Sequence, residues 1–236
     1  MNENAIREIL DKVVRNVLAD QCAAPAASPS FYPSSGSQAE PIPVELSARH
    51  VHLCEKDVQA LFGAPLTHVR DLSQPGEFLC KERVRLIGPK GVIDNVAILG
   101  PARKASQVEI SKTDARILGI DAPVRQSGDV AGSPGVILAS EKGVTALDKG
   151  LIVASRHIHM TPQDAARMHV ADGDLVSVRI ESTRPLILDD VLVRVNPNFK
   201  LSMHIDFDEG NSAGWDKTVF GVLVGKGGRY DGLCRC

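Results

Sequence analysis

The chain has 236 residues and a formal net charge of -2, with 29 acidic and 27 basic side chains. This near balance gives no electrostatic reason to expect binding to nucleic acid. No stretch approaches the roughly 20 apolar residues of a membrane-spanning helix, and the amphipathic start of the chain is unlike a signal peptide. The five cysteines show no disulfide-framework spacing, so we expect a reducing cytoplasm.

The first 42 residues divide into a helical pattern and a linker. Residues 1–20 place apolar side chains on one helix face and charged side chains on the other. Residues 21–42 are dominated by Ala, Pro and Ser, which is typical of a flexible linker. An isolated helix of this length is marginal in water and needs a surface for its apolar face. We therefore interpret residues 1–20 as a tethered docking or targeting peptide, with a helix packed on its own domain as the alternative.

Beyond residue 42, short β-branched segments bounded by Gly, Pro or Asp predict a mainly β fold. The expected strands are Val44–Leu46, Arg83–Ile87, Val92–Leu99, Gln107–Ser111, Gly135–Ala139, Leu151–Ala154, Leu175–Ile180, Leu186–Val195 and Leu201–Ile205. Short helices are expected at Lys56–Phe62, Thr113–Leu118 and Pro162–His169. This spacing favours compact β-barrels capped by short helices over alternating βαβ units. Residues 226–236, with Cys234 and Cys236, are expected to form a reduced tail.

One short motif occurs twice. Ser-Ala-Arg-His-Val-His occupies residues 47–52 and Ala-Ser-Arg-His-Ile-His occupies residues 154–159. An Asp follows each copy at the same distance, at Asp57 and Asp164. The repeat predicts two pseudo-repeated barrels built by internal duplication.

The repeated motif also predicts a metal site. Alternate residues of a strand face the same side, about 6.6 Å apart at Cα, so each His-x-His aims two imidazoles into one space. A histidine and a glutamate on other predicted strands add donors, which gives the candidate ligands His50, His52, Glu109, His157, His159 and His204. Three His and one Glu suit a zinc ion, and two His with open positions suit a second, catalytic one. Other divalent transition metals would also bind, and hydrogen-bonded polar strand ends are the alternative interpretation.

A turn after a predicted strand presents Arg103. A guanidinium at such a turn can bind an anion bidentately, although a solvated surface arginine fits the composition equally well. The chain contains no P-loop, dinucleotide fingerprint or nucleophile elbow. Phosphate chemistry here would therefore not use a nucleotide-binding loop.

Several ordered motifs together resemble one family. They are Ser47-Ala-Arg-His-Val-His-Leu53, Asp71-Leu-Ser-Gln-Pro-Gly-Glu-Phe78, Leu99-Gly-Pro-Ala-Arg103, Gln107-Val-Glu-Ile-Ser-Lys-Thr-Asp-Ala115, Arg156-His-Ile-His-Met160 and Met203-His-Ile-Asp206. They resemble the PduL-type phosphotransacylases, or phosphate propanoyltransferases, over nearly all of residues 43–215. The resemblance implies the reaction acyl-CoA + phosphate ⇌ acyl phosphate + CoA, with propanoyl as the expected acyl group and acetyl also compatible.

The resemblance further implies two zinc ions between two barrels that are interleaved in sequence. Residues 43–47 and 151–225 would form one barrel and residues 48–150 the other. It assigns His50 and His52 to one ion. It assigns to the other ion Glu109, His157, His159 and His204.

The resemblance also implies substrate contacts and partners. The phosphate-binding arginine falls on Arg103, and coenzyme contacts fall on Ser47, Arg70, Leu99 and Asn211. Arg70 stands where the family pattern has lysine, and Ala97 where it has arginine. Residues 1–20 resemble encapsulation peptides that dock on shell or core proteins of bacterial microcompartments, which implies a microcompartment lumen and propanediol degradation; we also expect a homo-oligomer.

Two rival functions are compatible with the same residues. Zinc sites with His and Glu ligands commonly activate water, so a metal-dependent thioester hydrolase is one rival. A structural zinc module that uses residues 1–20 for assembly is the other. In the transacylase interpretation, phosphate attacks the thioester directly in a ternary complex and Arg103 offsets the charge repulsion. Direct attack needs no protein nucleophile, and no base stands at a recognisable spacing from Cys54 or Cys80.

Overall fold

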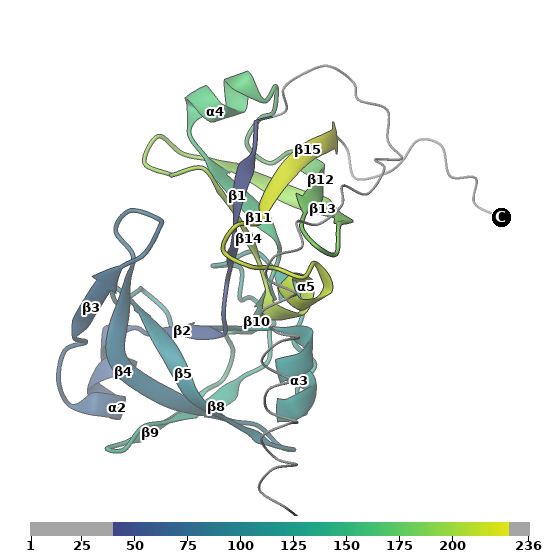
Figure 1. Cartoon of the computed structure of the whole chain (residues 1–236). Helices are drawn as coiled ribbons and strands as arrows, with labels where there is room; N and C mark the ends of the chain where they lie inside the picture. Colours follow the sequence, from purple (N-terminus) through teal and green to yellow (C-terminus); the bar gives the residue numbers. More distant parts are fainter. Residues whose placement is uncertain (1–39, 227–236) are drawn as a thin grey trace, which may run out of the picture. The chain divides into compact units, whose positions relative to one another are not determined.

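Two β units make up the part of the chain that the structure describes, residues 40–226 of a computed structural model (Figure 1). The predicted helix at 1–20, nearly all of the predicted linker and the predicted tail after Lys226 lie outside the described residues. Both β units belong to one compact unit of the chain. The fold is mainly β with few short helices, as predicted.

The first β unit is a closed six-stranded barrel with the order β1-β14-β11-β13-β12-β15. Its strands are β1 (Ile42–Leu46), β11 (His157–Met160), β12 (Leu175–Glu181), β13 (Leu186–Val195), β14 (Ser202–Ile205) and β15 (Phe220–Lys226). The first strand, β1, pairs parallel with β14 and antiparallel with β15. The barrel is therefore completed by a strand from the opposite end of the sequence.

The second β unit is a sheet that curls into a half-barrel, with the order β7-β10-β6-β2-β5-β4-β8-β9 and β3 paired to β4. Its strands are β2 (His50–His52), β3 (His68–Asp71), β4 (Phe78–Ile87), β5 (Val92–Gly100), β6 (Gln107–Ile110), β7 (Val124–Arg125), β8 (Val136–Ala139), β9 (Val144–Leu147) and β10 (Leu151–Ala154). Among the described residues β7 and β9 stay unpaired on their outer edges. We call this unit the half-barrel, because the predicted second barrel does not close.

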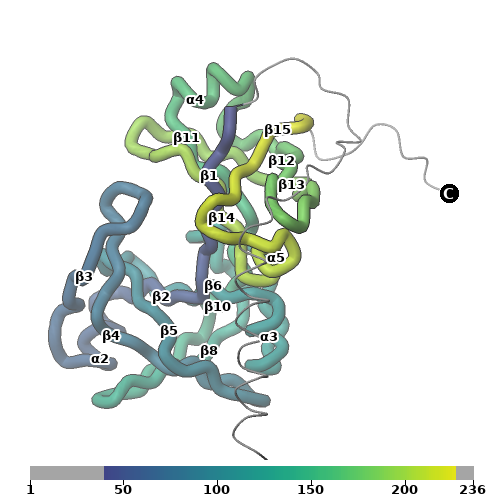
Figure 2. The backbone as a smooth tube through the Cα atoms, in the orientation of Figure 1, coloured from purple at the N-terminus to yellow at the C-terminus, as the bar shows by residue number. Residues whose placement is uncertain are grey.

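The chain passes between the two units twice. It leaves the barrel after β1 to enter β2, and it returns from β10 to β11 (Figure 2). Each unit has its own apolar core, with Ile98 and Leu138 fully buried in the half-barrel and Ile158 and Met203 fully buried in the barrel. Each copy of the Arg-His-x-His motif begins at one of these crossings. The four histidines of the two copies therefore lie where the two units meet.

Short helices follow the strands that carry the site. The three predicted helices are present as α2 (Glu55–Phe62), α3 (Lys112–Leu118) and α4 (Pro162–Arg167), and a fourth, α5 (Phe207–Ser212), was not predicted. Capping boxes start α3, α4 and α5, where an N-cap side chain and an acidic side chain three residues later exchange hydrogen bonds with the backbone. No helix among the described residues has the length and apolar character needed to cross a membrane.

Candidate active site

The two histidine motifs adopt the same strand arrangement. On β2, His50 is the register partner of Glu109 on the antiparallel strand β6. On β11, His157 is the register partner of His204 on the antiparallel strand β14. Side chains of directly opposed residues project from the same face of a sheet. Each motif therefore gains a third donor from its neighbouring strand.

The first donor group consists of His50, His52 and Glu109, all buried. His50 Nε2 lies 3.5 Å from Glu109 Oε2, and the two imidazole rings are 4.9 Å apart between centroids. One ligand atom from each of the three residues lies within 4.8 Å of the others. That spacing is compatible with one shared ion, since bonds of about 2.1 Å reach it from each donor.

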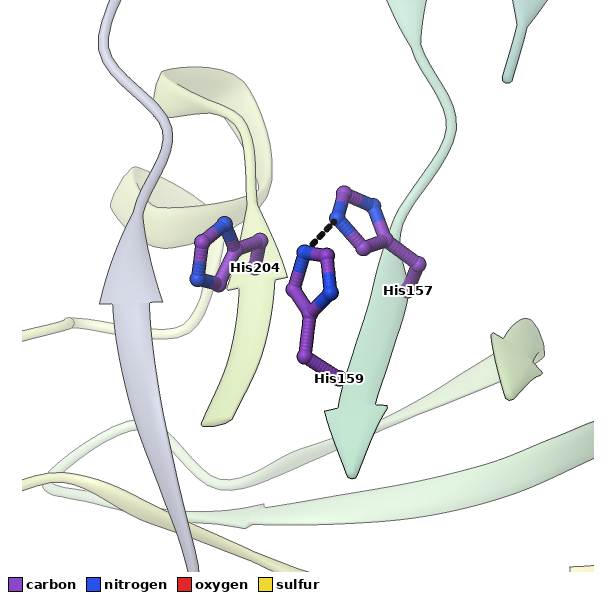
Figure 3. A group of neighbouring side chains, drawn as sticks. All are labelled: His157, His159 and His204. Carbon is purple, nitrogen blue, oxygen red and sulfur yellow. Dashed lines mark hydrogen bonds between the residues drawn. The ribbon is translucent and has the colours of Figure 1, made fainter. Parts of the chain in front are cut away.

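The second donor group consists of His157, His159 and His204 (Figure 3). The Nε2 atoms of His157 and His159 face each other at 3.0 Å, and the ring of His204 lies 4.9 Å from that of His159 between centroids. His159 Nδ1 is buried without a hydrogen-bond partner among the described residues. Three converging imidazoles with an orphaned nitrogen fit a metal ion better than a hydrogen-bonded polar cluster.

Backbone carbonyls orient the first histidine of each motif in the same way. His50 Nδ1 lies 2.7 Å from the carbonyl of Ala48, and His157 Nδ1 lies 2.9 Å from the carbonyl of Ser155. A carbonyl only accepts, so Nδ1 donates and Nε2 keeps its lone pair. Metal-binding histidines typically have such a second partner.

Burial favours ligand-ready protonation states. Burial, followed by the nearby histidines, lowers the pKa of His52 to about 3 and that of His159 to about 2. Burial also lowers the pKa of His204, to about 3. Burial raises the pKa of Glu109, but the charges of His50 and His52 and a hydrogen bond from Ser127 outweigh it and lower this pKa to about 2. Neutral imidazoles and an ionised carboxylate are the forms that bind metal.

The position of Glu109 differs from the expected ligand grouping. The family resemblance assigns it to the ion of His157, His159 and His204, whereas the structure groups it with His50 and His52. The reason is strand pairing, because β6 is adjacent to β2 and places Glu109 opposite His50. Burial lowers the pKa of His157 and of His204, and the charge of Glu109 partly opposes this lowering at both, so Glu109 also lies near the second donor group.

Arg103 is tied to the first donor group by hydrogen bonds. Its Nη2 donates to Glu77 Oε1 at 2.9 Å, and its Nη1 donates to Ser127 Oγ at 3.3 Å. Ser127 Oγ in turn donates to Glu109 Oε1 at 2.7 Å, and Gln107 Nε2 donates to the same carboxylate oxygen. The predicted anion-binding arginine is thus a part-buried group beside the histidines rather than a solvated surface side chain.

A cavity of about 300 Å³, which we call the central cavity, contains both donor groups. Six of its lining residues are the candidate ligands, and the others are Ser47, Gln74, Pro75, Glu77, Arg103, Ser127, Arg194 and Phe199. A neighbouring cavity of about 210 Å³ is lined by three of the residues that the family resemblance assigns to coenzyme contacts, and we call it the coenzyme-side cavity. It shares Ser47, His50, Gln74, Glu77 and His204 with the central cavity. The two cavities adjoin at these shared residues.

Comparison with known proteins identifies the family. The model of the family described as phosphate propanoyltransferase matches residues 43–216. The chain belongs to the phosphate propanoyltransferase family. Relatives with that name include one from Listeria monocytogenes, 56% identical over 78% of this chain and 88% of the relative. A relative from Salmonella typhimurium is 46% identical over 93% of this chain and 98% of the relative. Membership makes the chain an acyltransferase.

Within this family member, most predicted substrate contacts share one cavity. Ser47, Arg70 and Leu99 line the coenzyme-side cavity, together with Ala97. Asn211 lies exposed on α5 and lines neither this cavity nor the central one. The prediction for Asn211 as a substrate contact therefore has no support from these two cavities.

Sequence reasoning missed several residues of the central cavity. They are Gln74, Pro75, Glu77, Arg194 and Phe199, with the side chain of Ser127. Arg194 could have been found, because it lies within the predicted strand Leu186–Val195, in alternation with the buried Val193. The loop residues Gln74 and Glu77 give no periodic signal and are placed only by tertiary structure.

Proposed function

We propose that this acyltransferase interconverts acyl-CoA plus phosphate with acyl phosphate plus CoA, with propanoyl as the acyl group. The observation that carries the proposal is a single cavity that holds two histidine-based donor groups and Arg103. A phosphate oxygen attacks the thioester carbonyl, the C–O bond forms, the C–S bond breaks, and CoA leaves as its thiolate. Direct transfer of this kind needs both substrates bound together.

Two divalent ions, with zinc as the best match to the donors, would be held by the two groups. When bound, they supply Lewis-acid polarisation of the carbonyl and charge compensation for the phosphate. The donor set fits zinc because it offers imidazole nitrogens and a carboxylate in buried positions. Each group offers three protein donors, so a four-coordinate ion held there would keep a position for a substrate, which suits catalysis rather than a closed structural site.

In this proposal Arg103 binds the phosphate. Its guanidinium lies at the cavity wall, where it can offer bidentate donation to phosphate oxygens. Glu77 and Ser127 hold the side chain in place before substrate arrives. Pre-organised donors of this type reduce the repulsion between the anionic substrates.

The two described cysteines provide no acyl carrier. Cys54 Sγ donates to Asp57 Oδ2 at 3.2 Å, and neither Cys54 nor Cys80 lines the central cavity. Burial raises the pKa of the Cys80 thiol to about 11, which keeps it unreactive at neutral pH. These positions favour direct transfer over a covalent acyl-enzyme.

The test follows CoA release and acyl phosphate formation from propanoyl-CoA, with and without phosphate. We expect phosphate-dependent release with stoichiometric acyl phosphate, and its loss in His157→Ala. His169→Asn is the matched control, because His169 is exposed and lies outside the central cavity. Release that ignores phosphate would instead identify a thioester hydrolase, and no release by metal-loaded protein would identify a structural zinc module.

We further propose that residues 1–20 dock this enzyme on shell or core proteins of a bacterial microcompartment, as a homo-oligomer in the lumen. The family model begins only at residue 43, so the amphipathic segment and its linker lie outside the matched region. A fluorescent protein fused to residues 1–20 should co-localise with such compartments. The same fusion with Ile9 and Val13 changed to Glu should remain diffuse, and unchanged co-localisation would contradict the proposal.

A further inference from the structure

A third cavity adjoins the central cavity on another side. Its volume is about 320 Å³, and Arg194 and Phe199 line both cavities. The third cavity shares neither of these residues with the coenzyme-side cavity. Arg194 therefore stands where the central cavity meets an opening that the predicted coenzyme contacts do not occupy.

The strand and an aromatic ring fix the position of Arg194. Arg194 on β13 is the register partner of His159 on the parallel strand β11, so it faces the histidines while Val193 enters the barrel core. Its guanidinium carbon lies 5.9 Å from the centre of the Phe199 ring. That ring meets His159 edge to face at 4.4 Å between centroids. Phe199 thus lies against both the arginine and a candidate metal-ligand histidine.

Arg194 has no ion-pair partner within the described residues, although Asp172, whose Oδ1 accepts from the backbone N–H of Val195 at 2.8 Å, lines the same third cavity. Arg103, the other cation lining the central cavity, is paired with Glu77. Arg194 makes no ion pair and no side-chain hydrogen bond with any residue between 40 and 226. A half-buried guanidinium beside three metal-binding imidazoles would repel a dication. An anion between them removes this conflict, because it attracts both.

The internal repeat places different side chains beside His52 and beside His159. The carbonyl of Leu99 lies 3.3 Å from His52 Nδ1 on the strand parallel to β2, and Arg194 lies beside His159 on the strand parallel to β11. Equivalent places in the repeat therefore hold an apolar side chain at the coenzyme-side cavity and a cation at the third cavity. The cations of the coenzyme-side cavity, Arg49 and Arg70, do not line the central cavity, whereas Arg194 lines both the third and the central cavity and can bind a small oxyanion there.

We propose that Arg194 is a second phosphate-binding residue, and that phosphate enters and acyl phosphate leaves through the third cavity. The inference rests on the proposed function and deepens it, because it names the residue and route for the anionic substrate. Arg194 and Arg103 would contact the phosphate from opposite β units. Separate routes let the coenzyme and the phosphate bind without passing each other.

The binding test uses metal-loaded protein without coenzyme and inorganic phosphate as the probe, followed by calorimetry or 31P line broadening. Loss of a charge-assisted hydrogen bond should weaken phosphate binding about 10- to 100-fold in Arg194→Gln, with a smaller loss in Arg194→Lys. Arg116→Gln is the control, since Arg116 is exposed on α3 and lines none of these cavities. KM for phosphate should rise with the binding loss, while KM for propanoyl-CoA and the metal content stay unchanged.

The route has its own test. Gln126 lines the third cavity and is exposed, so Gln126→Glu adds a negative charge there without changing shape. We expect kcat/KM for phosphate to fall about 3- to 10-fold at low ionic strength, since a like charge repels an incoming anion. Gln59→Glu makes the same charge change on the exposed face of α2 and should leave kcat/KM unchanged.

Unchanged phosphate binding in metal-loaded Arg194→Gln would overturn the role of Arg194. Loss of metal together with weaker binding of both substrates would also overturn it, by showing a structural role. An unchanged kcat/KM for phosphate in Gln126→Glu would overturn the route. Failure of the proposed function is a separate outcome that is measured on the wild-type protein. That protein would then form no acyl phosphate, whatever the effect of the variants on phosphate binding.

Discussion

Arg156 Nη1 lies 2.7 Å from Glu209 Oε1, and this ion pair links the second histidine motif to the first turn of α5. The arginine of the first motif forms an equivalent ion pair. Arg49 Nε donates to Asp114 Oδ2 at 3.1 Å, and its Nη2 lies 3.0 Å from Oδ1 of that carboxylate. Asp114 and Glu209 are the third residues of helices that follow the two strands bearing Glu109 and His204. Each motif arginine therefore fixes its His-x-His strand to the helix behind the third donor.

Arg49→Gln should destabilise the fold more than Arg156→Gln. Asp114 is almost fully buried, so loss of Arg49 leaves its carboxylate without its cation at a cost of about 3 kcal/mol. Glu209 is more exposed, and we expect about 1 kcal/mol for its lost partner. Urea unfolding measures both. Arg85→Gln, which breaks an exposed pair with Asp94, should change stability by less than about 0.5 kcal/mol, and an equal loss in all three variants would contradict the prediction.

Local patterns predicted the elements that carry the site. The His-x-His repeat, the β-branched segments around Glu109 and His204, and three short helices all have short-range signals, and the structure contains them. The closure of the barrel by β1 depends on pairing across the whole chain. Only the family resemblance, and no local pattern, indicated it.

Two missed elements show what local patterns overlook. The capping box from Asp206 to Glu209 was a usable signal for α5, but six residues are too few for a helical period. The strand β15 (Phe220–Lys226) was missed because Gly221 and Gly225 interrupt its apolar alternation. The barrel core leaves no room for a side chain at Gly221, since an added Cβ would lie only 2.7 Å from Val178 Cγ1.

Gly221→Ala should therefore destabilise the barrel by about 1–3 kcal/mol through overpacking against the buried Val178. Gly225→Ala on the same strand is the matched control. Its added Cβ would meet Ser177 at an ordinary 3.8 Å, so its effect should be smaller. Thermal or urea unfolding of the two variants measures the difference. A loss of stability in Gly225→Ala as large as that in Gly221→Ala would show that strand propensity, not core packing, sets the requirement.

Metal-free protein should lose stability as the pH falls below about 6.5. Burial lowers the pKa of His52 and His204 to about 3 and that of His159 to about 2, below the value of about 6.5 in an unfolded chain. Between these values the unfolded chain binds more protons, so unfolding becomes easier as pH decreases. Each histidine contributes up to about 1.4 kcal/mol per pH unit in this window.

Urea unfolding of chelator-treated protein from pH 7.5 to 4.5 measures this slope. Glu109 adds a loss of the same sign below about pH 4.5, because its pKa is lowered to about 2. His204→Gln should reduce the slope above pH 4.5, while the exposed control His169→Asn should leave the contribution of the buried cluster intact. An equal slope in wild type and His204→Gln would contradict the prediction.

The grouping of Glu109 can be decided by metal binding. Its pairing with His50 predicts that Glu109→Gln weakens the first group, because a charged ligand oxygen becomes a neutral amide. If the chain binds the two proposed ions, we expect the metal content to fall toward one ion per chain, as measured by elemental analysis after dialysis. His204→Ala should weaken the other group instead.

A double-mutant comparison separates the two possible groupings. In a chain carrying His50→Ala and His52→Ala, only the second group can bind an ion, so any effect of Glu109→Gln there reports on that group. If Glu109 acts only with His50 and His52, the affinity of the remaining ion should change less than about threefold. A loss of about tenfold or more would instead assign Glu109 to the ion of His157, His159 and His204, as the family resemblance implies. The strand register would then place Glu109 close to His50 while its carboxylate binds across the boundary between the two β units.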